Sequence, residues 1–142
     1  IAALGTDQIA SLVLDQVQAM GAPQFNNFTT SQVQALTSDQ IIQLTTQQYV
    51  QLATAQVAAL GTQQLNIMEL EDFAALRAVQ IAALGTGQLQ SLALDHVAAL
   101  TTAQMQALAS IATDFLIPAD AAVKAYRYAE AMVAEKNRRA KA

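Results

Sequence analysis

The sequence contains no cysteine, which excludes disulfide bonds and every site built on a thiolate. Charged residues are also scarce: they make up 13% of the 142 residues, against about 25% in an average soluble domain. The chain is 54% hydrophobic, but no apolar run approaches the roughly 18 residues that a membrane-spanning helix needs. We therefore expect no transmembrane segment, and a surface solvated mainly by Gln, Thr, Ser and Ala.

Motifs that carry chemistry are missing as well. The sequence has no Walker loop, no dinucleotide-binding glycine pattern, no H-E-x-x-H and no G-x-S-x-G. We expect His96, the only histidine, to be a substitute helix cap or a surface side chain, and Glu69, Glu71 and Asp72 to form a solvated face. The sequence thus predicts no catalytic residue, no cofactor and no metal ion, and hence no enzyme.

Charge is divided unevenly along the chain, whose net charge is −4. Residues 1–123 hold nine of the eleven acids and a single base, Arg77. The other six bases are the candidate interaction residues: Lys124, Arg127, Lys136, Arg138, Arg139 and Lys141. They suit a helix that docks on a partner or an anionic surface, or one that only caps the fold. Six bases beside an acidic body make a weak nucleic-acid footprint, which predicts against such a partner.

What the sequence does contain is an eight-residue repeat. Cut every eight residues from Ile1, the stretch 1–112 gives fourteen units. Position 1 is apolar or aromatic and position 4 is apolar in all fourteen, while position 8 is Gln in eleven. A fixed short period is the signature of a repeat architecture. Positions 1 and 4, which include Phe25, Phe28, Tyr49 and Phe73, are therefore predicted to form the core.

Ala, Leu and Gln favour helix over strand, yet one continuous helix does not fit the repeat. Eight residues turn through about 800°, so the stripe formed by positions 1 and 4 would drift by about 80° in each unit. Interruptions are visible at positions 5 to 8, where Thr37-Ser38-Asp39-Gln40, Thr45-Thr46-Gln47-Gln48 and Thr101-Thr102-Ala103-Gln104 match the capping box S/T-x-x-E/Q. Gly5, Gly21, Gly61 and Gly85 occupy the same cap position, where glycine is suited both to ending one helix and to opening the next.

Some junctions lack a good cap. We expect longer merged helices there, near 6–20, 62–84 and 86–100, and short two-turn helices over 22–60. Burying two large side chains yields roughly 3–6 kcal/mol, whereas ordering eight residues costs roughly 12 kcal/mol. A unit therefore folds only when it is stacked on its neighbours. The predicted fold class is all-α, a solenoid-like stack of short capped helices that forms a compact, right-angled coil.

The repeat fades after Ala112, and Ile117-Pro118 breaks the chain. We therefore divide the chain into an octapeptide solenoid, residues 1–117, and a C-terminal capping or docking helix with a basic end, residues 118–142. That helix is predicted to cover about 119–139. Because the chain begins with Ile1, inside a repeat, we expect a processed chain or a piece of a longer array.

The units LTSDQI, LTTQQY and LTTAQM and the phrase MELEDFAALRAVQIAAL resemble the octapeptide arrays L-T-T-x-Q-[VI]-x-A-L of large repetitive bacterial proteins. The resemblance covers residues 1–112. It implies a bacterial repeat module in a surface or extracellular setting, with a cytoplasmic setting as the alternative, and it carries over no catalytic residue.

From these features we expect a non-enzymatic structural module that self-associates into a filament, layer or stalk. The alternative is a binding scaffold for a protein, peptide or glycan. If the Gln and Thr positions line up on one open face, they form an almost uncharged ladder that could bind another copy or a polar polymer.

Overall fold

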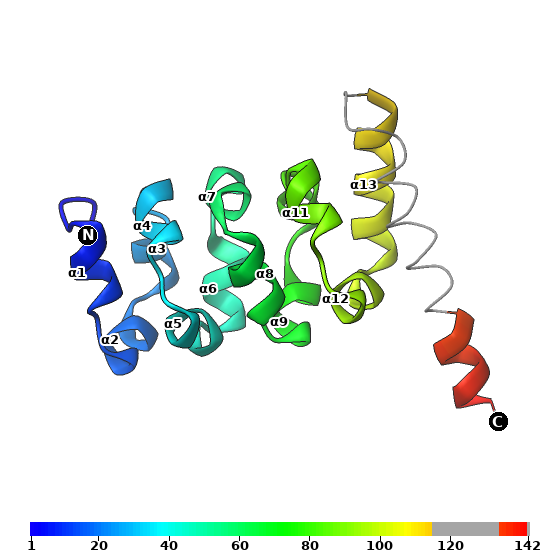
Figure 1. Cartoon of the computed structure of the whole chain (residues 1–142), viewed down its shortest axis with the longest axis horizontal. Coiled ribbons are helices and arrows are strands. Elements are labelled where there is room, and N and C mark those ends of the chain that lie inside the picture. Colours follow the sequence, from blue (N-terminus) through cyan, green and yellow to red (C-terminus); the bar gives the residue numbers. More distant parts are fainter. Residues whose placement is uncertain (115–133, 142) are drawn as a thin grey trace.

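The computed structural model describes residues 1–114 and 134–141, and every regular element within them is a helix. Thirteen helices lie between residues 6 and 114, and a further helix covers 134–140 (Figure 1). Their bounds are α1 Thr6–Ala10, α2 Leu14–Ala19, α3 Ala22–Phe25, α4 Thr30–Gln34, α5 Ser38–Gln43, α6 Thr46–Gln51, α7 Thr54–Ala59, α8 Thr62–Ile67, α9 Leu70–Ala75, α10 Ala78–Ala82, α11 Thr86–Gln90, α12 Leu94–Ala99 and α13 Thr102–Asp114. The predicted all-α class is confirmed.

Each helix packs against the helix three places further along the chain. One column of stacked helices contains α1, α4, α7, α10 and α13, a second contains α2, α5, α8 and α11, and the third contains α3, α6, α9 and α12. Three consecutive helices therefore make one coil of the solenoid, and the coils follow one another along its long axis (Figure 1). The coil is triangular in the sense that it has three sides, one helix to a side, and the right-angled corners expected from the one-residue junctions stay a prediction.

The core is the inside of this triangular coil. Position 1 is buried in every unit from Ile9 to Val97, and position 4 is buried in most, including Leu36, Leu44 and Leu52. The predicted core aromatics Phe25, Phe28, Tyr49 and Phe73 are all buried, and the rings of Phe25 and Phe28 stack with their centroids 4.8 Å apart. The two apolar positions of the octapeptide are thus confirmed as the hydrophobic core.

The merged helices expected near 6–20, 62–84 and 86–100 are wrong, because each of these stretches is broken at every octapeptide boundary. At two of the junctions without a capping hydroxyl, the glutamine three residues later supplies the missing acceptor. Gln16 Oε1 accepts from the backbone N–H of Val13 at 3.1 Å, and Gln80 Oε1 accepts from that of Arg77 at 2.7 Å. The glutamine is therefore enough to open a helix. The short helices predicted over 22–60 are confirmed.

One described helix does run through a junction. α13 passes Ala109 without a break, in the unit where position 8 is Ala112 instead of glutamine. Alanine has no side-chain acceptor for the N–H at this junction, but the junctions at Glu69 and Ala93 are broken without a glutamine, so its absence alone does not merge two helices. Gly61, by contrast, sits at its cap with φ −69°, ψ 157°, close to the −80°, 153° of Thr45. No described glycine has a positive φ, so these glycines open the next helix in the same extended conformation as the threonine caps.

The C-terminal boundaries are covered in part. The helix at 134–140 overlaps the end of the predicted 119–139 helix and runs one residue beyond it. The rest of that prediction, including Lys124, Arg127 and the break at Ile117-Pro118, lies outside the described residues. Among the helices that are described, none combines the length and the apolar character needed to cross a bilayer.

Candidate interaction surfaces

The glutamine at position 8 forms two kinds of hydrogen bond at once, as Gln40 shows. Its Oε1 accepts from the backbone N–H of Thr37 at 2.9 Å, which caps the start of its own helix α5. Its Nε2 donates to the backbone carbonyls of Ile9, at 2.9 Å, and Leu12, at 2.8 Å. Because Leu12 lies 28 residues earlier, at the junction between α1 and α2, a single side chain joins one coil to the coil before it.

This bond between coils is repeated along the whole described array. Eight position-8 glutamines donate from Nε2 to the position-4 carbonyl 28 residues earlier. They are Gln32, Gln40, Gln48, Gln56, Gln64, Gln80, Gln88 and Gln104. All except Gln88 are buried. The open polar ladder expected at the surface is therefore wrong for position 8: the ladder exists, but it lies inside the solenoid and its hydrogen bonds are used there.

The physical reason lies in the ends of short helices. A helix leaves N–H groups unbonded at its start and C=O groups unbonded at its end, and a helix of five or six residues consists largely of such groups. The carboxamide satisfies one donor at the start of its own helix and one acceptor at a helix end in the neighbouring coil. Buried polar groups that find partners in this way avoid a desolvation cost of about 1–3 kcal/mol each. The ladder thus explains how such short helices can be stacked with a dry interior.

His96 takes the place of the glutamine in the twelfth unit and keeps half of its role. The ring is buried, and Nε2 lies 3.0 Å from the carbonyl of Met68, 28 residues earlier, so that Nε2 must carry the donated proton. Nδ1 has no hydrogen-bond partner, and the cap is supplied from the neighbouring coil, where Asn66 Oδ1 accepts from the N–H of Ala93 at 2.7 Å. His96 is therefore neither the cap nor the surface side chain that was expected.

Asp72 replaces the glutamine in the ninth unit and cannot donate as an ionised carboxylate. A ladder glutamine at this place would reach the carbonyls of Ile41 and Leu44, and of these two the carbonyl of Ile41 accepts instead from the buried hydroxyl of Tyr49. Asp72 in turn accepts from the hydroxyl of Thr46. Burial raises the pKa of the Tyr49 hydroxyl, and the negative charges of Asp72 and Glu69 raise it further, so the phenol stays protonated and able to donate.

The acidic cluster is therefore divided. Glu69 and Glu71 are exposed as predicted, but Asp72 is buried, so the expectation of a solvated face is wrong for that residue. The described residues contain no group of three or more His, Cys, Asp or Glu side chains placed to hold a metal ion.

Tyr49→Phe is expected to lower the free energy of unfolding by about 1–3 kcal/mol, because the buried carbonyl of Ile41 loses its side-chain donor. In an Asp72→Gln background the restored carboxamide can reach the same carbonyl, so the same substitution should cost less than about 1 kcal/mol. Urea denaturation of the four proteins measures both costs. Equal costs in the two backgrounds would show that the tyrosine does not compensate for the aspartate.

In the first coil, which consists of helices α1–α3, the position-8 glutamines form no bond to another coil of the described residues. Gln8, Gln16 and Gln24 are exposed, and each keeps its cap: Oε1 accepts from the backbone N–H of Gly5 at 2.8 Å, Val13 at 3.1 Å and Gly21 at 2.6 Å. No bond from their Nε2 atoms is found within the described part of the chain. Three amide donors therefore lie at one end of the solenoid, in the orientation that joins coils elsewhere.

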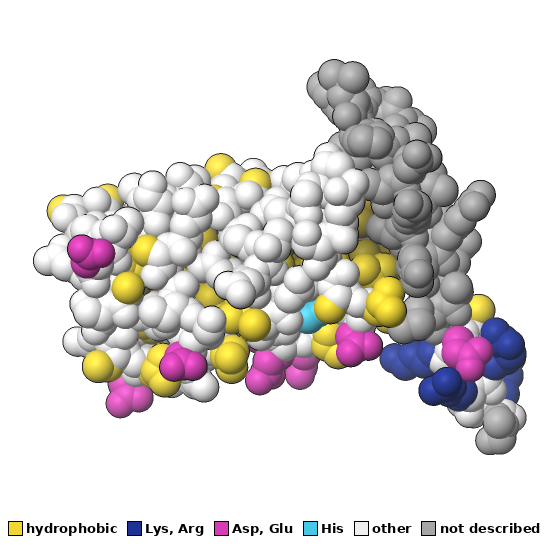
Figure 2. Space-filling view, viewed as in Figure 1, with side chains coloured by type: hydrophobic (Ala, Val, Ile, Leu, Met, Phe, Trp, Pro, Cys, Tyr) yellow, Lys and Arg dark blue, Asp and Glu magenta, His cyan; other side chains and the backbone are white. Residues whose placement is uncertain are grey.

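The basic residues lie at the other end of the described solenoid. Figure 2 shows acidic side chains along one long edge and the Lys and Arg side chains gathered on the helix at 134–140. Arg138 and Arg139 pair with Glu135 at 3.0 and 3.1 Å, and both are largely exposed. Lys136 and Lys141 are exposed too; three of the four described candidate residues lie on this helix, and Lys141 follows directly after it.

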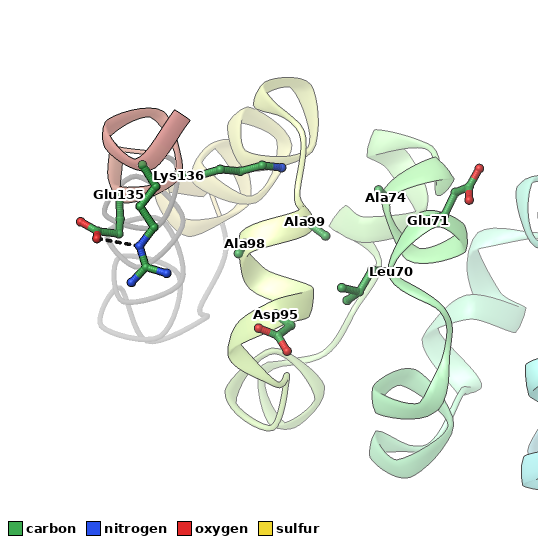
Figure 3. A pocket seen from close by; sticks show the side chains of 9 residues that line it. Leu70, Glu71, Ala74, Asp95, Ala98, Ala99, Glu135 and Lys136 are labelled. Carbon is green, nitrogen blue, oxygen red and sulfur yellow. Dashed lines mark hydrogen bonds and ion pairs between the residues drawn. The ribbon is translucent and has the colours of Figure 1, made fainter. Parts of the chain in front are cut away.

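A groove of about 620 Å³ separates this basic helix from α9 and α12 (Figure 3). Its floor contains Ala74, Ala98 and Ala99. Its rim carries Glu71 and Asp95 from the solenoid and Lys136 and Arg139 from the basic helix. Leu70, which is 43% exposed, also lines it. The solenoid side of the groove therefore carries carboxylates, the other side carries Lys136 and Arg139 together with Glu135, which pairs with Arg139, and the floor is apolar.

Comparison with protein families bears on this architecture. The family model of the ALTTAQ repeat matches the chain twice, at residues 15–46 and 66–102. These two stretches are similar to the ALTTAQ repeat. Searches of curated proteins and of solved structures gave no match.

The two ALTTAQ matches contain both the regular and the irregular units. The first includes Gln32 and Gln40, and the second includes Asp72 and His96, the two replacements of the ladder glutamine. The resemblance to a tandem octapeptide repeat family is thus confirmed. The letters A, L and T of the repeat name correspond to positions 3, 4 and 5, where one helix ends and the cap of the next helix begins.

Proposed function

We propose that this octapeptide array is a non-enzymatic structural module that associates with copies of itself. The observation that carries the proposal is the stacking interface between coils. It recurs from coil to coil along the described array, with Asp72 and His96 in place of the glutamine in two units, and it joins two different faces. A contact between two different faces that repeats by translation propagates without closing, as in a filament.

Two further features support a structural role. The nine buried polar side chains of the described part are all used for caps, bonds between coils or the Thr46–Asp72 bond, so the interior holds the chain together. The acidic solenoid and the basic helix at 134–140 also lie so that head-to-tail neighbours would bring opposite charges together. A bacterial surface or extracellular setting is part of the proposal, and it rests on the resemblance of the octapeptides to those of large repetitive bacterial proteins.

Sedimentation velocity over a range of protein concentrations, followed by electron microscopy, tests the proposal. At low salt we expect species that grow with concentration into linear polymers. At high salt the charged part of the contact is screened, so polymers should be shorter. A persistent monomer under both conditions would contradict self-association.

The groove beside Leu70 favours the alternative, a binding scaffold for a protein, peptide or glycan. A monomer that binds such a partner, and loses it when Leu70 and Ala98 are replaced by larger polar residues, would support the scaffold over the self-associating module.

A further inference from the structure

We propose that one corner of the solenoid binds a positively charged, amphipathic helix of another protein. The surface is the corner of the triangular coil where the second column of helices meets the third. It consists of an apolar row, formed by Ile42, Leu70 and Leu94, and of three carboxylates, those of Glu69, Glu71 and Asp95. The inference goes beyond the proposed function, because the stacking of coils does not use these exposed side chains.

The apolar row has one member in each of three successive coils. Ile42 lies near the end of α5, just before the junction with α6, whereas Leu70 and Leu94 are the first residues of α9 and α12. All three therefore lie where a helix of the second column is followed by a helix of the third. Their exposed fractions are 40%, 43% and 53%. The fold thus leaves large apolar side chains in a row on its surface.

The leucines of this row are not needed for folding. Position 6 is Thr or Ser in nine of the fourteen units, and it is Leu in three, at Leu14, Leu70 and Leu94. Threonine opens α6, α7 and α8 at the same place in the unit. Leu70 and Leu94 belong to helices that pack against each other, so their exposed side chains form part of one surface. Contiguous exposed apolar side chains mark a surface that a partner covers.

The charges beside the apolar row are negative. Glu69, Glu71 and Asp95 are exposed, and no base of the described residues forms an ion pair with them. The solenoid has a single base, Arg77, whose guanidinium donates to the carbonyl of Leu52. Figure 2 shows apolar side chains between the acidic ones along the same long edge. A complementary partner therefore combines apolar side chains with positive charges.

Two other occupants fit this surface less well. The same corner of a second copy would bring carboxylates against carboxylates, which repel each other. The chain's own helix at 134–140 is basic and lies across the groove from Leu70, but its apolar side chains are the alanines Ala134 and Ala140. Leu70 and Leu94 remain exposed beside it. The apolar row therefore calls for a partner helix with larger apolar side chains.

A helix that lies along the solenoid matches the spacing of the coils. Packed helices lie about 8–10 Å apart, and seven residues of an α-helix advance by about 10.5 Å. Leucines at every seventh residue of a partner would therefore meet Ile42, Leu70 and Leu94 in turn, and lysines beside them would lie near the carboxylates. A helix of about 18 residues is long enough to cross the three coils.

Two synthetic peptides and two full-length variants test this inference. The first peptide has about 18 residues, with leucines at the first and fourth positions of each heptad and lysines at most of the others. The second has the same composition in an order that gives no apolar stripe. The edge variant Leu70→Gln, Leu94→Gln removes two members of the apolar row. The matched control Val13→Gln, Val79→Gln changes valines that are 59% and 57% exposed outside it.

Isothermal titration calorimetry measures the Kd of each peptide, and circular dichroism confirms that both variants are folded. We expect the wild type to bind the striped peptide about 10-fold more tightly than the scrambled one. The edge variant should lose about 10-fold in affinity for the striped peptide, and the control should stay within about threefold of the wild type. Wild-type protein that binds both peptides equally, or neither, would overturn the inference. Equal affinities of the two variants would overturn it as well, and sedimentation tests self-association separately.

Discussion

Gln40→Glu is expected to lower the free energy of unfolding by about 3–5 kcal/mol. The substitution keeps the size of the side chain and the oxygen that caps Thr37, but it replaces two amide-to-carbonyl bonds with a buried charge that faces the carbonyls of Ile9 and Leu12. A buried charge without a partner is among the most destabilising changes in a protein. Urea denaturation measures the loss.

The matched control is Gln16→Glu. Gln16 occupies the same position in the unit and the same column of helices, where α5 stacks on α2, but it is exposed and has only the cap bond. The control should change stability by no more than about 0.5 kcal/mol. If the two substitutions cost the same, the bond between coils contributes nothing.

The pH dependence of stability separates the effect of the buried charge in Gln40→Glu from the effect of a changed side-chain shape. Burial and the facing carbonyls raise the pKa of the carboxyl introduced at position 40, so the folded state binds its proton more tightly than the unfolded state does. Stability of Gln40→Glu should therefore recover as the pH falls, because the neutral carboxyl can donate to one carbonyl, and it should be lowest at neutral pH.

Leu52→Ala is expected to lower the free energy of unfolding by about 2–5 kcal/mol. Leu52 occupies position 4, is 1% exposed, and belongs to the hydrophobic core, so its truncation leaves a cavity between coils. Ile42→Ala is the control, because Ile42 is 40% exposed at position 2 and should lose less than about 1 kcal/mol. Thermal unfolding of both variants gives the comparison, and similar losses would contradict the assignment of positions 1 and 4 to the core.

The hydrophobic pattern was enough to predict which residues are buried. Apolar side chains recur at positions 1 and 4, and a helix of two turns brings exactly these two positions to one face, so Ile41 and Leu44 could be assigned to the core without coordinates. The breaks at Thr37 and Thr45 were also predictable, because a capping box is a local signal that needs only four consecutive residues.

The bonds between coils could not be predicted in the same way. Gln40 reaches Leu12 across 28 residues, and nothing local indicates how many short helices fill that distance. Junctions without a capping hydroxyl, such as those at Val13 and Arg77, are nevertheless broken, because the glutamine three residues later accepts from the backbone N–H at the cap. A glutamine that caps its own helix and also bonds to the neighbouring coil makes hydrogen bonds that stabilise the break more than a continued helix would be stabilised.

The replacements of the ladder glutamine were misinterpreted for a related reason. Asp72 and His96 are polar residues at a position that resembles a surface face when each unit is considered alone. Their burial follows from the coil stacked against them. A useful signal was available in the sequence: Tyr49 is the one tyrosine at position 1, and it lies where a buried hydroxyl can replace the donor that Asp72 lacks.

The central claim is that the position-8 glutamines join the coils through their side-chain amides. Nuclear magnetic resonance of the carboxamide protons tests it most directly, by measuring how fast each exchanges with water. The account predicts slow exchange for the eight glutamines that donate between coils, from Gln32 to Gln104, and fast exchange for Gln8, Gln16 and Gln24 in monomeric protein. Equally fast exchange in both groups would contradict it.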